Sequence, residues 1–314
     1  RCVGIDFDRR IALVTEGGDD EPSELAVRTV IGADGAFSGV RSSMQRRDRF
    51  DYSQDYLPHG YKELTIPPGE GGAWRIEKNA LHIWPRGTHM MIALPNSDGS
   101  FTCTLFWPFE GRNSVAELQT EADVERFFRA QFPDAMDLIP DLTRDFLENP
   151  TGSLVTVKCS PWSVSDAAVL IGDACHAVVP FFGQGMNAAF QDCTVLDECM
   201  KAHPADLSRA FEEYHDNRKH DCDVLAHLAV QNYIEMRDHT ASPMFRAFKR
   251  FERTLTSLFP KVFIPLYEMI SFSTIPYSKA VARSRLQFMI LTVIGVVLLI
   301  AVLTGLLLLL GVLL

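Results

Sequence analysis

The chain has 314 residues, of which 47% are hydrophobic, so it can bury a sizeable core in one large or two medium domains. The formal net charge is −10 and no block of basic residues occurs, which argues against a nucleic-acid partner. The seven cysteines form no C-x-x-C pair and are odd in number, a pattern that favours a reducing compartment over a disulfide framework. We expect no metal site.

The N-terminal part predicts strands. Residues 2–7 and 11–15 predict two short strands joined by a turn, and residues 25–31 predict a third strand that leads into a glycine-containing turn. Because the first residue is Arg1 rather than Met, we expect the true N-terminus to lie upstream of this sequence.

The stretch "VIGADGAFSGVR", residues 30–41, contains the turn that follows the third strand. Asp34 ends the strand, Gly35 lets the backbone approach a ligand closely, and Ser38 can cap the next helix. Arg41 lies one turn into that helix, and a helix N-terminus together with an arginine suits a pyrophosphate. Most turns of this kind have no functional meaning, so the motif by itself is a weak indication.

The middle of the chain predicts an antiparallel sheet. Apolar residues alternate from residue 60 to residue 109, in "GYKELTI", "ALHIWP", "HMMIALP" and "SFTCTLFWPF", with turn clusters between these runs. Residues 117–132 predict an amphipathic helix, and "SLVTVKCSPW" predicts a returning strand. One face of the sheet has alternate side chains that fit a ligand cavity and an ordinary core equally well: Met90, Ile92, Leu94, Thr104 and Phe106.

A second motif, "VLIGDACHAVVPFFGQGMNAAFQDCTVLDECM", residues 169–200, predicts a strand, a glycine-rich turn and a long helix. Asp173 follows the strand, where its carboxylate can accept a hydrogen bond from a ribose hydroxyl. The turn would leave unpaired N–H groups at Gly185, Met186 and Asn187, which favours an anionic group such as the ring of a reduced flavin. A loop that only packs is the alternative. Two such motifs, separated by a sheet with large side chains, favour a flavin.

The C-terminal part predicts helices and then a membrane anchor. Residues 206–270 have a helical pattern interrupted by prolines, and residues 288–314 contain no charged residue. About 20 apolar residues span a bilayer, and soluble helices that are apolar on all sides are rarely this long. Lys279, Arg283 and Arg285 precede the apolar run, so the positive-inside tendency places the large N-terminal part in the cytosol.

The two glycine motifs resemble those of the FAD-dependent aromatic hydroxylase family: "GADGAFSGVR" is similar to its D-G motif, and "LIGDACHAVVPFFGQGMNAAFQD" to its G-D motif. Within that family, "HGYKELTIPP", "LHIWPRG", "MIALPN", "NYIEMR" and "FIPLYEMISFS" resemble the kynurenine 3-monooxygenases. The resemblance covers nearly the whole chain up to Arg285. It implies an α/β (α+β) fold, with an FAD-binding Rossmann-like domain that is incomplete at its N-terminus, an inserted antiparallel substrate sheet, a C-terminal helical region and a transmembrane helix.

The same resemblance divides the chain and locates it. The expected parts are a remainder of the FAD-binding domain (1–59), the substrate sheet with its helix (60–160), the G-D motif with its helix (161–205), the C-terminal helical region (206–285) and the transmembrane anchor (288–314). The expected location is the mitochondrial outer membrane, with the catalytic part in the cytosol. The endoplasmic reticulum membrane is the alternative.

The activity that the resemblance implies is the hydroxylation of L-kynurenine to 3-hydroxy-L-kynurenine in tryptophan catabolism. FAD is the expected cofactor, NADPH the co-substrate that reduces it, and dioxygen adds to the reduced flavin as a C4a-hydroperoxide. Because this chemistry is flavin-borne, we expect no catalytic side chain. His176, which follows the G-D turn, is expected to be structural or solvent-facing.

The resemblance and the motifs together predict the site residues. The expected cofactor-binding residues are Asp173, Gly185, Met186, Asn187, Asp34 and Arg41. The expected substrate-binding residues are Asn232 and Tyr267 at the amino-acid end of kynurenine, with Phe181, Phe182, Met90, Ile92, Leu94, Thr104 and Phe106 around the ring.

Two alternatives to this function remain open. The family's opening strand, G-x-G-x-x-G turn and helix are absent from the sequence, as are the Arg and Tyr that bind the substrate carboxylate in the family. We therefore expect the chain alone to bind FAD poorly and to be inactive, and an inactive membrane-tethered remnant is one alternative. The other is a different membrane-associated flavoprotein, such as an epoxidase or a reductase acting on lipids, although "HGYKELTIPP" and "NYIEMR" argue against it.

Overall fold

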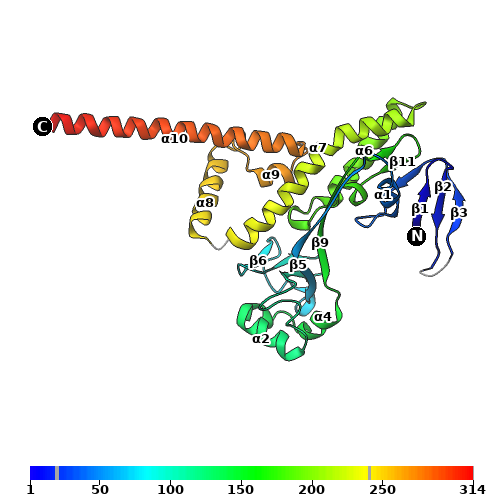
Figure 1. Ribbon diagram of the computed structural model, residues 1–314. Coiled ribbons are helices and arrows are strands. Elements are labelled where there is room, and N and C mark those ends of the chain that lie inside the picture. Colours follow the sequence, from blue (N-terminus) through cyan, green and yellow to red (C-terminus); the bar gives the residue numbers. More distant parts are fainter. Residues whose placement is uncertain (18–20, 240–241, 314) are drawn as a thin grey trace.

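The computed structural model describes residues 1–17, 21–239 and 242–313 of the chain (Figure 1). These residues form an α/β body from which one long helix, α10, projects, so the predicted fold class is confirmed. The described strands make three sheets, and the two glycine motifs follow neighbouring strands of one of them.

The N-terminal strands form an antiparallel sheet in the order β1-β2-β3. Its strands are β1 (Cys2–Asp6), β2 (Ile11–Val14) and β3 (Ser23–Ala26). The single strand predicted for residues 25–31 is wrong, because the chain changes sheets within it. β3 pairs with β2, whereas β4 (Val30–Gly32) pairs with β11 (Ala168–Leu170) in another sheet.

The second sheet has the order β10-β11-β4, and β10 spans Ser163–Val164. β4 and β11 are parallel, and Gly32 lies opposite Leu170, so both strands end at the same edge. From this edge the chain continues into α1 (Gly39–Met44) and α5 (Asp173–His176). The carboxyl ends of parallel strands form the usual ligand crevice of α/β proteins. The sheet thus brings together two motifs that are far apart in the sequence.

The third sheet is the predicted antiparallel one, with the order β6-β7-β8-β5-β9. Its strands are β5 (Asp51–Ile66), β6 (His82–Pro85), β7 (Met90–Pro95), β8 (Phe101–Pro108) and β9 (Gly152–Ser160). β5 begins earlier than the predicted sheet and crosses the domain boundary predicted at residue 59. It is long because its first half pairs with β9, while its second half pairs with β8.

Alternation along β7 and β8 separates the two faces of this sheet. Met91, Leu105 and Trp107 pack on one face in a core that includes Phe127 and Phe128. The helices over this face are α2 (Glu121–Gln131), α3 (Pro133–Met136) and α4 (Leu142–Glu148). The opposite face, which we call the inner face, packs against the 3-10 turn η2 (Pro180–Phe182) and the end of α7.

Helices make up the C-terminal part, as predicted. In chain order they are α6 (Gly185–Ala202), α7 (Leu207–Ile234), the π-helical turn η3 (Glu235–His239), α8 (Pro243–Leu258), α9 (Leu266–Ser271) and α10 (Tyr277–Leu313). The prolines mark helix starts, because Pro243 is the first residue of α8 and Pro265 immediately precedes α9. A further 3-10 turn, η1 (Glu70–Gly72), lies in a loop.

α10 contains a candidate membrane span. Its segment Tyr277–Gly305 is long and apolar enough to cross a membrane, and the apolar window within it is not buried against the body. The side chains from Met289 to Leu303 are mostly exposed, whereas the core helix of a soluble protein would be covered. The predicted anchor, residues 288–314, falls within α10 except for residue 314, which lies outside the described residues.

Candidate functional site

Two cavities meet at Asp173, at the edge where β4 and β11 end. The first, here called the helix cavity, has a volume of about 630 Å³, and Gly35, Gly185 and Met186 are among its lining residues. The second, here called the sheet cavity, has a volume of about 600 Å³ and lies against the inner face of the five-stranded sheet. Asp173 and Gly183 line both cavities, so one ligand in each would meet at these residues.

The backbone around the helix cavity leaves room for an anionic group. Gly35 and Gly183 have φ angles of 79° and 64°, and no atom lies within 4 Å of a Cβ placed on either residue. α6 has 18 residues and begins at Gly185, and its N-cap residue, Gln184, makes no side-chain capping hydrogen bond. The first N–H groups of α6 are therefore left to a ligand, and the helix dipole favours a negative one. These features fit a flavin.

Asp34 and Arg41 position the first motif. The Asp34 Oδ2 accepts a hydrogen bond from the N–H group of Gly39 (2.8 Å) at the start of α1. The Arg41 side chain is 2% exposed, and its Nη1 and Nη2 atoms donate to the carbonyl oxygens of Ala174 (2.7 Å) and Ala36 (2.5 Å). Arg41 thus ties the two motif loops to each other. The contacts of Asp34 and Arg41 with a cofactor stay predictions.

The cofactor residues predicted in the second motif lie at the helix cavity, with one exception. Asp173, Gly185 and Met186 line it. Asn187 is not part of the lining, and its Nδ2 donates instead to the Oε1 of Gln184 (3.2 Å). Partial removal of water raises the pKa of Asp173, although a nearby histidine lowers it in part. The role of each residue stays a prediction.

The sheet cavity collects most of the predicted substrate residues. Its lining includes Ile92 and Leu94 from β7, Thr104 and Phe106 from β8, Phe181 and Phe182 from η2, and Tyr267 from α9. Ile92 pairs with Thr104 across the two strands and Met90 pairs with Phe106, which puts these side chains on one face. Met90 does not line the cavity, because it is fully buried in the cluster that contains Phe106 and Phe181.

Asn232 lies behind the sheet cavity and supports its wall. Its Nδ2 donates to the carbonyl oxygen of Phe181 at 2.7 Å, which ties η2 to the end of α7. The ring of Phe181 packs against that of Phe106, with centroids 4.9 Å apart, and Tyr267 stacks on Phe182 at 5.6 Å. The aromatic wall is therefore held by a hydrogen bond on one side and by ring packing on the other.

Sequence reasoning missed several polar residues of the sheet cavity, of which Tyr61 and Glu63 lie on β5 and Ser153 on β9. Tyr61 and Glu63 of β5 line it, opposite Phe106 and Thr104 on the paired strand. The alternation in "GYKELTI" places Tyr61 and Glu63 on one face of the strand. Which neighbour that face would meet depends on strand order, which the pattern does not contain.

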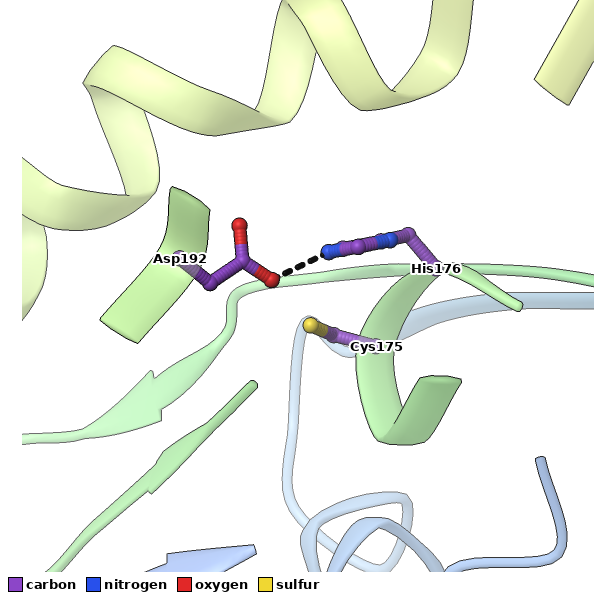
Figure 2. A group of neighbouring side chains, drawn as sticks. All are labelled: Cys175, His176 and Asp192. Atoms are coloured by element: carbon purple, nitrogen blue, oxygen red, sulfur yellow. Dashed lines mark hydrogen bonds and ion pairs between the residues drawn. The ribbon is translucent and has the colours of Figure 1, made fainter. Parts of the chain in front are cut away.

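A buried ion-pair network lies beneath the second motif (Figure 2). The Oδ2 of Asp192 in α6 accepts a hydrogen bond from the His176 Nε2 (2.5 Å; Figure 2). The same oxygen accepts from the Gly172 N–H group (2.9 Å), and Oδ1 accepts from the Arg218 Nε (2.8 Å). Burial opposes ionisation of Asp192, but His176 and Arg218 lower its pKa below the ordinary value. Burial also opposes protonation of His176, yet its neighbours, Cys175 and Asp192 among them, raise its pKa well above the ordinary value. The network joins the motif loop to α6 and α7.

Cys175, His176 and Asp192 bring three potential metal-ligand atoms within 4.8 Å of one another (Figure 2). An ion-pair network explains this cluster better than a metal does, because both Asp192 oxygens already accept hydrogen bonds and one donor is the Arg218 guanidinium. Burial raises the pKa of the Cys175 thiol to about 11, so this side chain is not a ready thiolate ligand. His176 is buried and structural rather than solvent-facing.

The spacing of α6 contained a sign of this network that sequence reasoning missed. Asp192 is four residues from both Ala188 and Leu196, and all three are buried. A carboxylate on the buried face of a helix needs a partner of opposite charge or several hydrogen-bond donors. The pattern therefore indicates a buried partner, although it does not say that the partner is on α7.

Comparison with known proteins places the chain in a flavoprotein class. A family model described as "FAD binding domain" matches residues 3–232. The matched range includes both glycine motifs, the residues of β5, β7 and β8 that line the sheet cavity, and the three residues drawn in Figure 2. The chain belongs to this FAD-binding family.

Among individual proteins, the chain is similar to kynurenine 3-monooxygenases. It is 52% identical over 273 residues to that of Flavobacterium psychrophilum, covering 87% of this chain and 61% of the relative. It is 51% identical over 291 residues to that of Dictyostelium discoideum (89% and 62%) and 48% identical over 273 residues to that of Sus scrofa (86% and 57%). The chain thus spans about three fifths of the length of these relatives.

Solved structures support the fold. The oxygenase of 2-methyl-3-hydroxypyridine-5-carboxylic acid superposes with a TM-score of 0.61 at 18% identity, covering 77% of this chain and 62% of that one. HpxO from Klebsiella pneumoniae, solved with FAD and uric acid, superposes with a TM-score of 0.57 at 21% identity, covering 79% and 59%. At these identities the likeness concerns the fold alone.

Proposed function

We propose that the protein to which this chain belongs is an FAD- and NADPH-dependent monooxygenase that hydroxylates L-kynurenine to 3-hydroxy-L-kynurenine in tryptophan catabolism. The observation that carries this proposal is the meeting of the helix cavity and the sheet cavity at Asp173. A cofactor in the first cavity would border a substrate in the second. The names of the relatives supply the identity of the substrate.

When bound, FAD would supply the chemistry that the surrounding side chains cannot, which is the activation of dioxygen with electrons from NADPH. One oxygen atom enters the kynurenine ring as a hydroxyl group and the other leaves as water, while NADPH and one proton are consumed and NADP⁺ is released. The chain's own part is to orient the ring and to exclude water with the aromatic wall of Phe106, Phe181 and Phe182. The uncapped start of α6 would stabilise negative charge on the cofactor.

The polarity of the sheet cavity favours an amino-acid substrate over a lipid. Glu63, Thr104 and Tyr267 contribute polar groups to its lining, and Asn232 lies directly behind it. A site for a lipid chain would be apolar throughout. Polar groups on the wall of an otherwise aromatic cavity suit a ring that carries a zwitterionic side chain.

We place the protein in the mitochondrial outer membrane, with its catalytic body in the cytosol. The apolar helix α10 supports membrane attachment. Lys279, Arg283 and Arg285 stand between the body and the apolar run, which supports a cytosolic body, where NADPH is available. The choice of organelle comes from the family resemblance, and the endoplasmic reticulum is the alternative.

The replacement of Asp173 by alanine tests the cofactor assignment. Loss of a charged hydrogen bond costs roughly 1.5–3 kcal/mol, so Asp173→Ala should raise the dissociation constant for FAD by about 10- to 150-fold. The measurement is flavin fluorescence during titration of the apoprotein. Asp216→Ala, which changes an exposed carboxylate on α7, is the matched control and should leave FAD binding unchanged. Equal FAD affinity in the two variants would refute the placement of the cofactor at Asp173.

A further inference from the structure

α8 turns its apolar side away from the protein. Apolar side chains recur along one side of this helix at helical spacing, at Met244, Phe248, Phe251, Leu255 and Leu258. Met244, Phe251 and Leu258 are 82%, 50% and 65% exposed. A surface helix of a soluble protein normally buries such a stripe. The exposed stripe of α8 therefore indicates a surface that contacts an apolar partner, such as another protein or a lipid membrane.

The side of α8 that meets the body is charged. Glu252 is buried and forms an ion pair with Lys249 (3.1 Å), and Lys249 also pairs with Glu235 of η3 (3.2 Å). These residues lie on a different side of the helix from the apolar stripe. α8 thus docks on the protein through an ion-pair cluster and leaves most of its apolar stripe uncovered.

α8 lies at the level where the uncharged run of α10 begins. The ring of Phe248 stacks on that of Phe288 in α10, with centroids 5.8 Å apart, and Phe263 contacts Phe288 edge-on at 6.1 Å. Phe288 is the first residue of the uncharged run. Figure 1 shows α8 beside α10 and steeply inclined to it, with the body on one side of α8 and the free length of α10 on the other. If α10 crosses a bilayer along the membrane normal, α8 lies along the surface of that bilayer.

The charge of α8 suits an anionic membrane surface. The helix has four basic residues, Arg246, Lys249, Arg250 and Arg253, against one acidic residue, although the whole chain has a net charge of −10. A helix with an apolar stripe, basic residues on its polar side and high amphipathicity is typical of membrane interfaces. The cytosolic leaflet carries negatively charged lipids that attract such basic segments.

We propose that α8 is an interfacial helix, which inserts its apolar stripe among the lipids next to the start of the uncharged run of α10. Arg250 and Arg253 bind anionic lipid headgroups. The inference rests on the proposed membrane attachment through α10. Its consequence is a second contact with the bilayer. α10 alone would leave the body free to rotate and tilt about one helix, whereas α8 fixes which side of the body faces the membrane.

Fluorescence of labelled cysteines tests this position. The full chain is reconstituted into phosphatidylcholine vesicles, with or without phosphatidylserine, after a polarity-sensitive dye is attached to Phe251→Cys on the apolar stripe or to Ser257→Cys on the opposite side of α8. Val297→Cys reports on α10, and the unsubstituted chain gives the background from Cys193, which is exposed. We expect nitroxide lipids to quench the dye at position 251. We expect aqueous iodide to quench the dye at 251 several-fold less than the dye at 257.

A second set of variants tests the role of the basic residues of α8. Arg250→Gln with Arg253→Gln should reduce the extra protection at position 251 that phosphatidylserine provides, while Arg126→Gln with Arg129→Gln on α2, an equally spaced exposed pair, should not. Equal protection in both double variants would overturn the role of the arginines in holding anionic lipid.

The outcomes separate this inference from the proposed anchor. Iodide quenching at 251 as strong as at 257, with the dye at 297 in lipid, would overturn the position of α8 and leave the anchor intact. A dye at 297 in water would overturn both. Protection of 251 from iodide without quenching by nitroxide lipids would mean that protein covers the stripe, as in a contact with a second copy of the chain, and would also overturn the proposal.

Discussion

Asn232 and Tyr267 act on the sheet cavity at the scale of single side chains. Asn232→Ala removes the hydrogen bond to the Phe181 carbonyl, and Tyr267→Phe removes a hydroxyl while keeping the ring that stacks on Phe182. A neutral hydrogen bond contributes about 1 kcal/mol, so each change should raise the KM for kynurenine by about fivefold and leave the FAD content intact. Kynurenine-stimulated NADPH oxidation, with the hydroxylated product quantified, is the measurement.

The exposed neighbour Gln231 provides the control for this pair, since Gln231→Ala changes an amide on α7 that does not line the cavity. Its KM should equal that of the unsubstituted protein. Variants of Asn232 and Tyr267 that lose FAD but keep a normal dependence on kynurenine would show that these residues belong to the cofactor side.

The burial of His89 should make the stability of the protein depend on pH. It is buried between the rings of Phe127 (5.3 Å) and Phe132 (5.8 Å), and burial lowers its pKa to about 4. In the unfolded chain its pKa is about 6.5, so the unfolded state binds an extra proton between these values, and the free energy of unfolding should fall by roughly 3 kcal/mol as pH falls from 6.5 to 4. Urea unfolding across this range is the measurement.

Comparison with variants isolates the contribution of His89 from that of other groups. His89→Phe should flatten the decline in unfolding free energy between pH 6.5 and 4, whereas His220→Gln, at an exposed position on α7, should not change it. A decline of the same steepness in His89→Phe would show that His89 is protonated as easily in the folded protein as in the unfolded chain.

At the scale of elements, Asp192 joins the G-D loop to α6 and α7 through His176, Gly172 and Arg218. Asp192→Asn should leave the Arg218 charge buried without its counter-ion, which typically costs about 3–5 kcal/mol of stability. Denaturant unfolding of the apoprotein measures this loss. FAD affinity should fall as well, because the loop that carries Asp173 is fixed by the same network.

Asp197 is the matched control on the same helix. Its carboxylate pairs with Lys201 at the surface (2.6 Å), and exposed pairs of this kind contribute little to stability. Asp197→Asn should therefore leave the unfolding free energy nearly unchanged. If Asp192→Asn were as mild, the network would be no more important to stability than a surface ion pair.

At the scale of the whole molecule, the helix α10 projects from the body and contains the proposed membrane anchor. Fusion of residues 278–314 behind a fluorescent protein should direct it to a membrane, because this segment contains the whole uncharged run and the basic residues before it. The family resemblance makes the mitochondrial outer membrane the expected one. Co-localisation with organelle markers is the measurement. Reticular fluorescence would contradict the choice of organelle, and diffuse cytosolic fluorescence would contradict the anchor itself.

The sequence by itself determined those features that depend on local pattern. Alternation from Met90 to Phe106 predicted a sheet face, because side chains in a strand change sides at every residue. The uncharged run predicted the exposed helix α10, because length and hydropathy are properties of a single segment. The two glycine motifs predicted turns before helices, and their resemblance to a known family led to FAD. In each of these cases the relevant neighbours are close in the chain.

Only the tertiary structure decided which distant groups meet. The division of the predicted strand at residues 25–31 follows from pairing with two different strands, and Arg41 bonds to Ala174 because β4 and β11 lie side by side. The partner of Asp192 on α7 and the outward turn of the α8 stripe were likewise absent from any local pattern. Such contacts depend on strand order, helix packing and register, which are set by the simultaneous burial of many side chains, and a periodicity specifies only the side on which a residue lies.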